Sequence, residues 1–186
     1  MLDVVLGVAL AAFLALPMLL IWLAVATTSR GGGIFSQVRI GKGGKEFVCY
    51  KFRTMRRDAP VCSAKQMAEQ GGADRYLTPI GRFLRRTSLD ELPQIWNVIK
   101  GDMSFVGPRP LIAEEREVHR ARESRDVYSV RPGITGLAQV KGRNSLSDER
   151  KVELDAQYLN EFGFLQDVRI LGLTALGVIS RKDIDA

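Results

Sequence analysis

Two adjacent carboxylates, Asp90 and Glu91, lie between arginines, with Arg85 and Arg86 before them and Arg109 after them. A site that handles a phosphate ester needs these residue types, because an anionic nucleophile or metal ligand must work beside cations that hold the phosphate. Consecutive helical residues point about 100° apart, so the two carboxylates cannot face each other across one bond. They can divide the work instead: one attacks or binds metal, and the other orients it or moves a proton.

The acidic pair also has a purely structural interpretation. Acidic residues are common in the first turn of a helix, where the dipole stabilises them by about 0.3–1 kcal/mol. The sequence predicts such a turn, with Ser88 as N-cap and Glu91 at capping-box spacing. The arginines favour the functional interpretation, because guanidinium groups bind phosphate with two parallel hydrogen bonds. Arg109 lies between two prolines that stiffen its backbone, and a structural pairing with Asp102 is its alternative.

Three other residue types in the chain are also capable of taking part in chemistry. Lys51 ends an apolar strand pattern, where a lysine either extends to solvent along its stem or points into a cleft. His119 lies in a charged helical segment, which favours a solvated surface position over catalysis. The two cysteines, Cys49 and Cys62, are far apart in sequence, and with a single histidine they exclude a thiol-rich zinc site.

The N-terminal segment is apolar, with no charged residue from Val4 to Ala26. A straight helix of this length would span the ~30 Å hydrocarbon core of a membrane. No basic residue precedes the run and no evident cleavage site follows it, so a cleavable signal peptide is not expected. Pro17 predicts a kink, after which the helix either spans the membrane or re-enters the same leaflet. These residues alone leave both arrangements open.

The rest of the chain is basic. All 27 Lys and Arg lie beyond residue 29, together with 20 of the 21 Asp and Glu. A basic part beside a membrane segment favours anionic partners such as phosphate headgroups and nucleotides, and it favours the cytoplasmic side of the membrane. No nucleic-acid-binding module is recognisable, so nucleic acid is not expected as a partner.

Hydrophobic periodicity predicts the elements of this basic part. Alternating residues around a glycine turn predict two strands over 34–52, and a short helix is expected over 63–70. Longer helices are expected over 78–86, 89–100, 110–125, 147–161 and 167–185. The segment 130–140 is expected to be a turn followed by an extended stretch. The last helix has an apolar stripe that suits the core or a membrane surface, and the membrane surface is favoured.

Four motifs resemble, in order, those of the small monotopic phosphoglycosyl transferases, also called bacterial sugar transferases. They are Lys-Phe-Arg-Thr-Met at 51–55, Asp-Glu-Leu-Pro-Gln at 90–94, the segment 101–110, and Arg-Pro-Gly-Ile-Thr-Gly at 131–136, the last followed by Gln139 and by 142–144. Each motif is weak alone, but four in sequence over most of residues 34–160 are specific.

This resemblance implies the transfer of a sugar-1-phosphate from a UDP-sugar to a polyprenyl phosphate, usually undecaprenyl phosphate, with release of UMP. Such a transfer would be the first membrane step of bacterial glycoconjugate assembly. Asp90 would attack the sugar-bearing phosphorus and carry a covalent phospho-sugar, and Glu91 would assist it. The family also implies Mg2+, placed by these two carboxylates. As substrate-binding residues the resemblance implies Lys51, Arg85, Arg109, Arg131, Gln139 and Arg143.

The resemblance further implies that the N-terminal helix is broken at Pro17 and re-enters the bacterial inner membrane, with the catalytic part on the cytoplasmic face. The expected fold is α+β. It combines a re-entrant membrane helix over 1–29 with a small mixed α/β cytosolic domain over 30–186. Short strands and amphipathic helices in contact with phospholipid complete this domain.

Two other functions stay as alternatives. In a membrane-bound nucleotide-sugar phosphohydrolase, water would replace the lipid phosphate, which predicts free sugar phosphate and no lipid product. A non-catalytic membrane scaffold predicts that Asp90→Asn leaves function intact.

Overall fold

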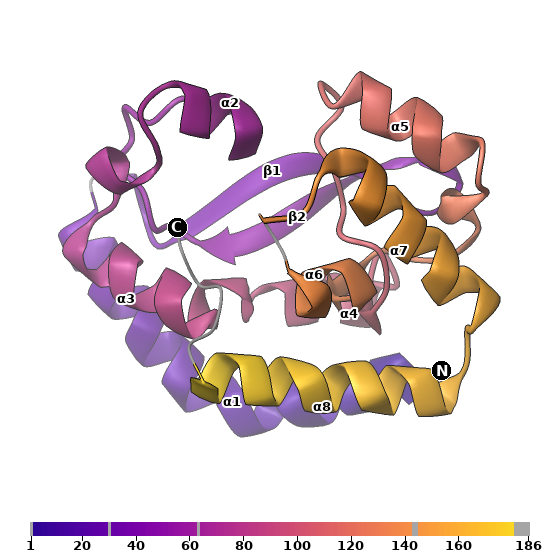
Figure 1. The fold of residues 1–186 in the computed structure, drawn as a ribbon. Helices are drawn as coiled ribbons and strands as arrows, with labels where there is room; N and C mark the ends of the chain where they lie inside the picture. The colour runs from indigo at the N-terminus through magenta and orange to yellow at the C-terminus, as the bar shows by residue number, and fades with distance from the viewer. Residues whose placement is uncertain (1, 30, 63, 143–144, 181–186) are drawn as a thin grey trace. The chain divides into compact units, whose positions relative to one another are not determined.

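The computed structural model describes residues 2–29, 31–62, 64–142 and 145–180. Its first elements, in which η denotes a 3-10 helix, are α1 (Leu2–Thr28), β1 (Ile34–Ile40), η1 (Lys42–Gly44), β2 (Glu46–Phe52), α2 (Ala64–Glu69), η2 (Asp74–Tyr76), α3 (Pro79–Thr87), η3 (Leu89–Glu91) and α4 (Gln94–Lys100) (Figure 1). The chain continues with β3 (Ser104–Val106), α5 (Arg116–Glu123), η4 (Val127–Ser129), β4 (Gly133–Thr135), α6 (Leu137–Lys141), α7 (Asp148–Asn160) and α8 (Phe164–Ser180). Short strands among many helices confirm the predicted mixed α/β class.

The chain forms two compact units. The first holds the described residues up to Gln37 and those from Val48 to Lys100, and the second holds Val38–Phe47 and the described residues from Gly101 onward. The boundary therefore passes through the β1–β2 hairpin, whose tip belongs to the second unit. The predicted division at residue 29 concerns membrane and cytosol and stays a prediction.

Helix α1 is the candidate membrane segment. Among the described residues it is the one helix long and apolar enough to cross a membrane, by length and composition alone. Phe13 and Leu16 on this helix are largely exposed, as a lipid-facing surface requires. The helix is continuous through Pro17, and Figure 1 shows its axis changing direction along its length. Re-entry into one leaflet stays a prediction.

The second half of α1 also builds the core of the first unit. Val25 of α1, Phe52 of β2 and Leu84 of α3 are fully buried together. Leu89 and Leu92, which flank the acidic pair in sequence, pack against this cluster. The apolar helix therefore supports the 3-10 turn that carries Asp90 and Glu91, in addition to its predicted role in the membrane.

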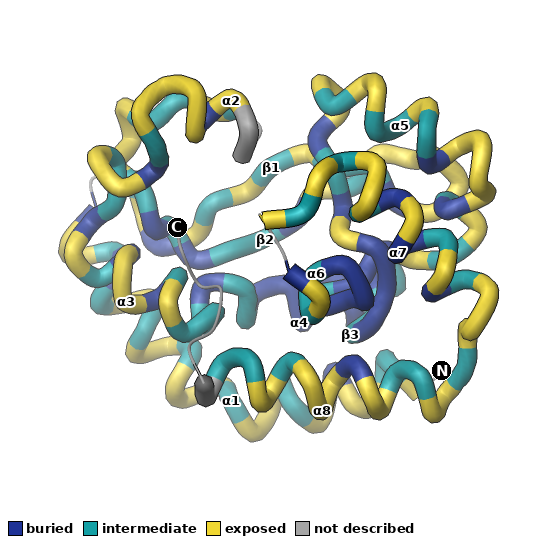
Figure 2. Tube along the Cα trace, viewed as in Figure 1, coloured by how far each residue is buried: buried dark blue, intermediate teal, exposed yellow. Residues whose placement is uncertain are grey.

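The second unit is built on a parallel strand pair. Strand β3 pairs with β4, with Ser104 opposite Gly133 and Val106 opposite Thr135. Helices α6, α7 and α8 cover this pair with a common core that includes Val106, Leu154 and Ile170. Val106 at the end of β3 is buried, and α6 begins with the buried residues Leu137 and Ala138; Figure 2 colours buried residues dark blue.

Three predicted elements differ from the structure. Helix α5 begins at Arg116 instead of 110, and the expected extended stretch after Thr135 is helix α6. The expected helix over 89–100 is divided into η3 and α4. Pro93 explains this division, because it has no N–H to donate to the carbonyl of Leu89, and the chain makes tighter 3-10 bonds instead.

The predicted capping box at this division is wrong. Ser88 has a left-handed backbone (φ 56°) and ends α3, and its side chain makes no cap bond to the next turn. The hairpin strands, the short helix α2 and helix α7, which is capped by the Ser147 hydroxyl, are confirmed. Helix α8 is described as far as Ser180, and the rest of its predicted range lies outside the described residues.

The close approach of α3 to the end of β2 gives a stability prediction. A Cβ added at Gly81 would lie 1.9 Å from the carbonyl oxygen of Thr54, so Gly81→Ala must separate two backbone segments. We expect it to lower the free energy of unfolding by about 3 kcal/mol or more. Gly172→Ala is the matched control, because that helical glycine has no described atom within 4 Å of the added Cβ, and it should raise stability slightly. Denaturant unfolding in detergent that ranked the two variants equally would contradict this packing.

Candidate active site

The acidic pair lies on the 3-10 turn between α3 and α4. The Asp90 residue is only 8% exposed, whereas Glu91 is half-buried. A carboxylate held away from water interacts more strongly with neighbouring cations and loses less solvation when a substrate covers it. The turn therefore presents one enclosed and one more accessible carboxylate from consecutive positions.

Lys51 points to this pair. Its Nζ lies 2.5 Å from Oε1 of Glu91, and both side chains are about one-fifth exposed (20% and 19%). The lysine comes from the end of β2, 40 residues earlier in the chain. Lys51 is thus partly buried against Glu91 instead of extended to solvent, and its position in a cleft stays a prediction.

Arg85 ties α3 to the segment that follows β2. Its Nε donates to Oγ1 of Thr54 at 3.1 Å, and Nη2 lies 3.5 Å from the sulfur of Met55. The first unit thus joins two of the four motifs, residues 51–55 and the acidic turn, with the predicted substrate-binding residue Arg85.

Asn97 is a positioning residue that sequence reasoning missed. Its fully buried side chain accepts from the backbone N–H of Tyr50 at 3.1 Å and donates to the carbonyl of Val48 at 2.6 Å. These bonds attach α4 to β2 at Val48 and Tyr50, directly before Lys51. An asparagine inside the apolar pattern of a short helix was the sequence signal that could have identified it.

The remaining predicted residues belong to the second unit. Arg109 is exposed between two buried prolines, and Arg131 is exposed at the entry to β4. Gln139 is half-buried and donates to the carbonyl of Ile134 at 2.9 Å. Arg143 lies outside the described residues. Substrate binding by these four residues stays a prediction.

His119 differs from its predicted solvated position. It is half-buried, with Nδ1 hydrogen-bonded to the hydroxyl of Tyr128 and Nε2 2.9 Å from the carbonyl of Ile112. Burial raises the pKa of Tyr128, against a smaller lowering by Arg122, so the phenol is neutral and donates to Nδ1. The Nε2–H then donates to the carbonyl, an assignment inferred from the hydrogen-bond network. The histidine is thus engaged structurally.

A buried ion pair, also missed from sequence, lies in the second unit. Nη2 of Arg122 on α5 is 2.6 Å from Oδ2 of Asp155 on α7, and the two side chains are 4% and 2% exposed. Burial raises the pKa of Asp155, and the neighbouring guanidinium counteracts this effect. The carboxylate therefore depends on Arg122 to keep its charge.

The acidic turn fits a magnesium ion that the substrate helps to hold. Among the residues that the structure describes, no three His, Cys, Asp or Glu side chains gather into a complete metal cluster. Mg2+ commonly uses only one or two carboxylates together with water and substrate phosphates. Asp90 and Glu91 can supply that share of the ligands.

The model of the bacterial sugar transferase family matches residues 1–181. The chain belongs to this family. The resemblance seen in the four motifs is thereby confirmed, and the acidic turn, with Lys51 and Arg85 beside it, is the candidate active site of a bacterial sugar transferase.

Curated relatives of this sugar transferase share its sequence over most of the chain. Galactosyl transferase CpsE of Streptococcus agalactiae is 44% identical over 77% of this chain and 34% of its own length. An undecaprenyl-phosphate galactose phosphotransferase of Salmonella typhimurium is 40% identical over 88% of this chain and 37% of its own length. The sugar transferase EpsL of Bacillus subtilis, named as uncharacterized, is 41% identical over 89% and 80%. The chain thus spans about a third of the first two relatives and four-fifths of the third.

Proposed function

We propose that this chain transfers a hexose-1-phosphate from a UDP-sugar to undecaprenyl phosphate and releases UMP. The observation that carries the proposal is the enclosed Asp90 beside the Glu91–Lys51 pair, on the turn that bears the family motif. The name of the Salmonella relative, an undecaprenyl-phosphate galactose phosphotransferase, supports both a sugar phosphate as the group transferred and undecaprenyl phosphate as the acceptor.

In the first step, a carboxylate oxygen of Asp90 attacks the β-phosphorus of the UDP-sugar. A bond forms between this oxygen and phosphorus, the bond to the bridging oxygen breaks, and UMP leaves with the electron pair. The product is a phospho-sugar on Asp90. Attack by an anion on a charged diphosphate is slow unless cations reduce the repulsion, and Lys51 and Arg85 supply positive charge in the same unit.

In the second step, an oxygen of undecaprenyl phosphate attacks the same phosphorus. The aspartyl–phosphorus bond breaks, the Asp90 carboxylate is restored, and the lipid diphospho-sugar is formed. Glu91 is suited to orient or deprotonate the incoming phosphate, because it is more accessible than Asp90 and Lys51 fixes its position. Arg109 would hold the nucleotide-sugar through bidentate bonds.

Asp90 and Glu91 would bind Mg2+ together with the phosphates, and the ion would neutralise charge that develops on the leaving oxygen. The apolar α1 would bring these residues to the lipid substrate at the cytoplasmic face of the inner membrane. This topology and the phospholipid contacts are part of the proposal.

The decisive experiment is a UMP-release assay on the full chain in nanodiscs, with undecaprenyl phosphate, Mg2+ and a panel of UDP-sugars that begins with UDP-galactose. Release that depends on the lipid, together with a lipid-linked sugar, supports the transferase. UMP release that yields free sugar phosphate without lipid product would indicate the phosphohydrolase. No release with any donor would favour the non-catalytic scaffold.

Removal of divalent metal gives a further prediction. We expect EDTA to lower UMP release by at least about 100-fold, because the leaving phosphate loses its main source of neutralisation. Excess Mg2+ should restore the rate, whereas the same EDTA treatment should leave the far-UV circular dichroism unchanged. Full activity in EDTA would exclude the metal from the mechanism.

A further inference from the structure

The backbone around Arg109 is held at four successive carbonyl groups. The carbonyl of residue 108 accepts a hydrogen bond from the N–H of Gly133 at 3.0 Å, and that of Arg109 accepts one from Nη1 of Arg122 at 2.8 Å. The carbonyl of residue 110 accepts from Nη1 of Arg39 at 3.2 Å, and that of residue 111 accepts from the N–H of Ile40 at 2.9 Å. The donors come from β4, α5 and β1, so separate parts of the second unit converge on one short segment. An exposed arginine on such a backbone loses little conformational freedom when it binds a ligand.

Arg122 is the more deeply buried of the two side-chain donors, at 3% exposed against the half-buried Arg39. One terminal nitrogen of its guanidinium binds the Arg109 carbonyl, and the other binds Asp155. Placing an ion pair almost entirely out of water carries a large desolvation cost, and well-packed apolar residues could replace it without loss of stability. Stability alone therefore does not explain the buried Arg122–Asp155 pair, whereas the bond from Arg122 to the Arg109 carbonyl gives the pair a role in holding that residue.

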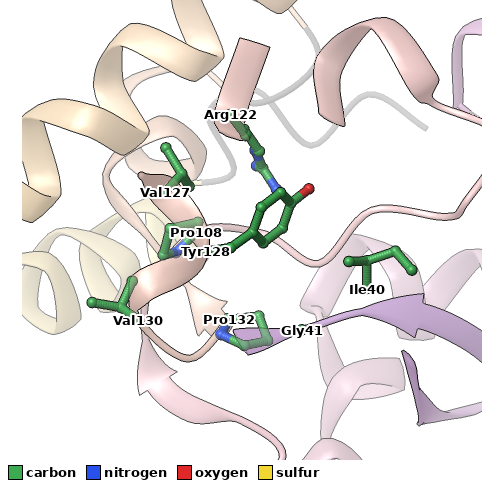
Figure 3. A pocket seen from close by; sticks show the side chains of 8 residues that line it. All are labelled: Ile40, Gly41, Pro108, Arg122, Val127, Tyr128, Val130 and Pro132. Atoms are coloured by element: carbon green, nitrogen blue, oxygen red, sulfur yellow. The ribbon is translucent and has the colours of Figure 1, made fainter. Parts of the chain in front are cut away.

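The surroundings of Arg122 exclude direct contact with a substrate. Figure 3 shows Arg122 and Tyr128 beside Pro108 and Pro132, around a cavity of about 10 Å³. Such a volume accommodates about one water molecule and no nucleotide or sugar. Any effect of Arg122 on the reaction must therefore pass through the residues that it holds.

We propose that Arg122, fixed by Asp155, is a positioning residue that sets the orientation of Arg109 toward the nucleotide-sugar. This inference rests on the proposed function for the ligand, but the positioning itself is a property of the second unit. Arg109 is the residue that contacts the substrate, and Arg122 acts through the carbonyl of Arg109.

The test is a double-mutant cycle in the UMP-release assay. Arg122→Lys keeps a charge for Asp155 but replaces the two-nitrogen fork by one nitrogen. We expect it to raise KM for the UDP-sugar about 10-fold and to change kcat less than about twofold, because a displaced binding group weakens substrate binding. In an Arg109→Ala background the same exchange should change KM less than about twofold, since no guanidinium remains to be misdirected.

Two control variants distinguish an effect on the position of Arg109 from a general loss of stability. Arg120→Lys makes the same exchange at an exposed position of α5 and should leave KM unchanged. Val152→Ala removes a buried side chain from α7 and should lower stability, with the same effect on KM whether or not Arg109 is present. A KM increase in Arg122→Lys that persists in the Arg109→Ala background, or no increase at all, would overturn the proposal.

Hydrogen–deuterium exchange distinguishes a failure of the positioning proposal from a failure of the proposed function. Peptides covering 107–116 should exchange faster in Arg122→Lys than in the wild type or Arg120→Lys, whatever the activity. If the wild type releases no UMP, the proposed function fails, and exchange alone decides the positioning. Unchanged exchange in these peptides would then refute it.

Discussion

Asp90→Asn is expected to lower UMP release by about 10⁴-fold or more. The amide has nearly the size of the carboxylate but is a neutral, poor nucleophile, so the step that forms the phospho-aspartate is lost. The variant should also fail to retain label from a UDP-sugar radiolabelled in the sugar, when no lipid acceptor is present. Scintillation counting of the precipitated protein, with the intact mass, measures this directly.

Asp58→Asn is the matched control for this substitution. Asp58 is in the same unit but is largely exposed, in a surface pair with Arg56 at 3.2 Å, so Asp58→Asn should change the rate of UMP release less than about twofold. Circular dichroism should confirm that both variants fold. Label retained by Asp90→Asn would assign the nucleophile to another residue, and a fully active variant would refute the covalent mechanism.

Asp155→Ala is expected to lower the free energy of unfolding by about 3–5 kcal/mol. Its partner Arg122 is 4% exposed, so the substitution leaves a buried guanidinium without its carboxylate. Denaturant unfolding in detergent, followed by far-UV circular dichroism, measures the change.

Two variants test that explanation. Glu153→Ala, on the same helix, breaks the exposed pair of Glu153 with Arg150 and should cost less than about 1 kcal/mol. The double exchange Arg122→Met with Asp155→Leu removes both charges and should recover most of the stability, while KM for the UDP-sugar stays raised because the bond to Arg109 is gone. Equal losses in Asp155→Ala and Glu153→Ala would show that burial does not govern this pair.

Local patterns were sufficient for several elements. Alternation around 41–44 predicted the β1–β2 hairpin, and the helix predicted over 147–161, with Asp148 and Glu149 in its first turn, is α7. These features depend on neighbours a few residues away, which a sequence displays directly. The 3-10 turn at 89–91 was missed because the capping-box spacing outweighed Pro93, whose missing N–H divides the helix.

The candidate site likewise has features that could be predicted from the sequence and contacts that could not. Residue types and local spacing were enough to predict the residues suited to phosphate chemistry, the apolar segment and the family that the motifs resemble. The folded chain was needed to show that Lys51 pairs with Glu91, that Asn97 attaches α4 to β2, and that Arg122 with Asp155 holds the Arg109 carbonyl. Each of these contacts joins side chains or backbone 13 to 49 residues apart. Burial and packing in the folded chain determine which groups pair in these contacts, and residue type and local spacing do not predict such pairs.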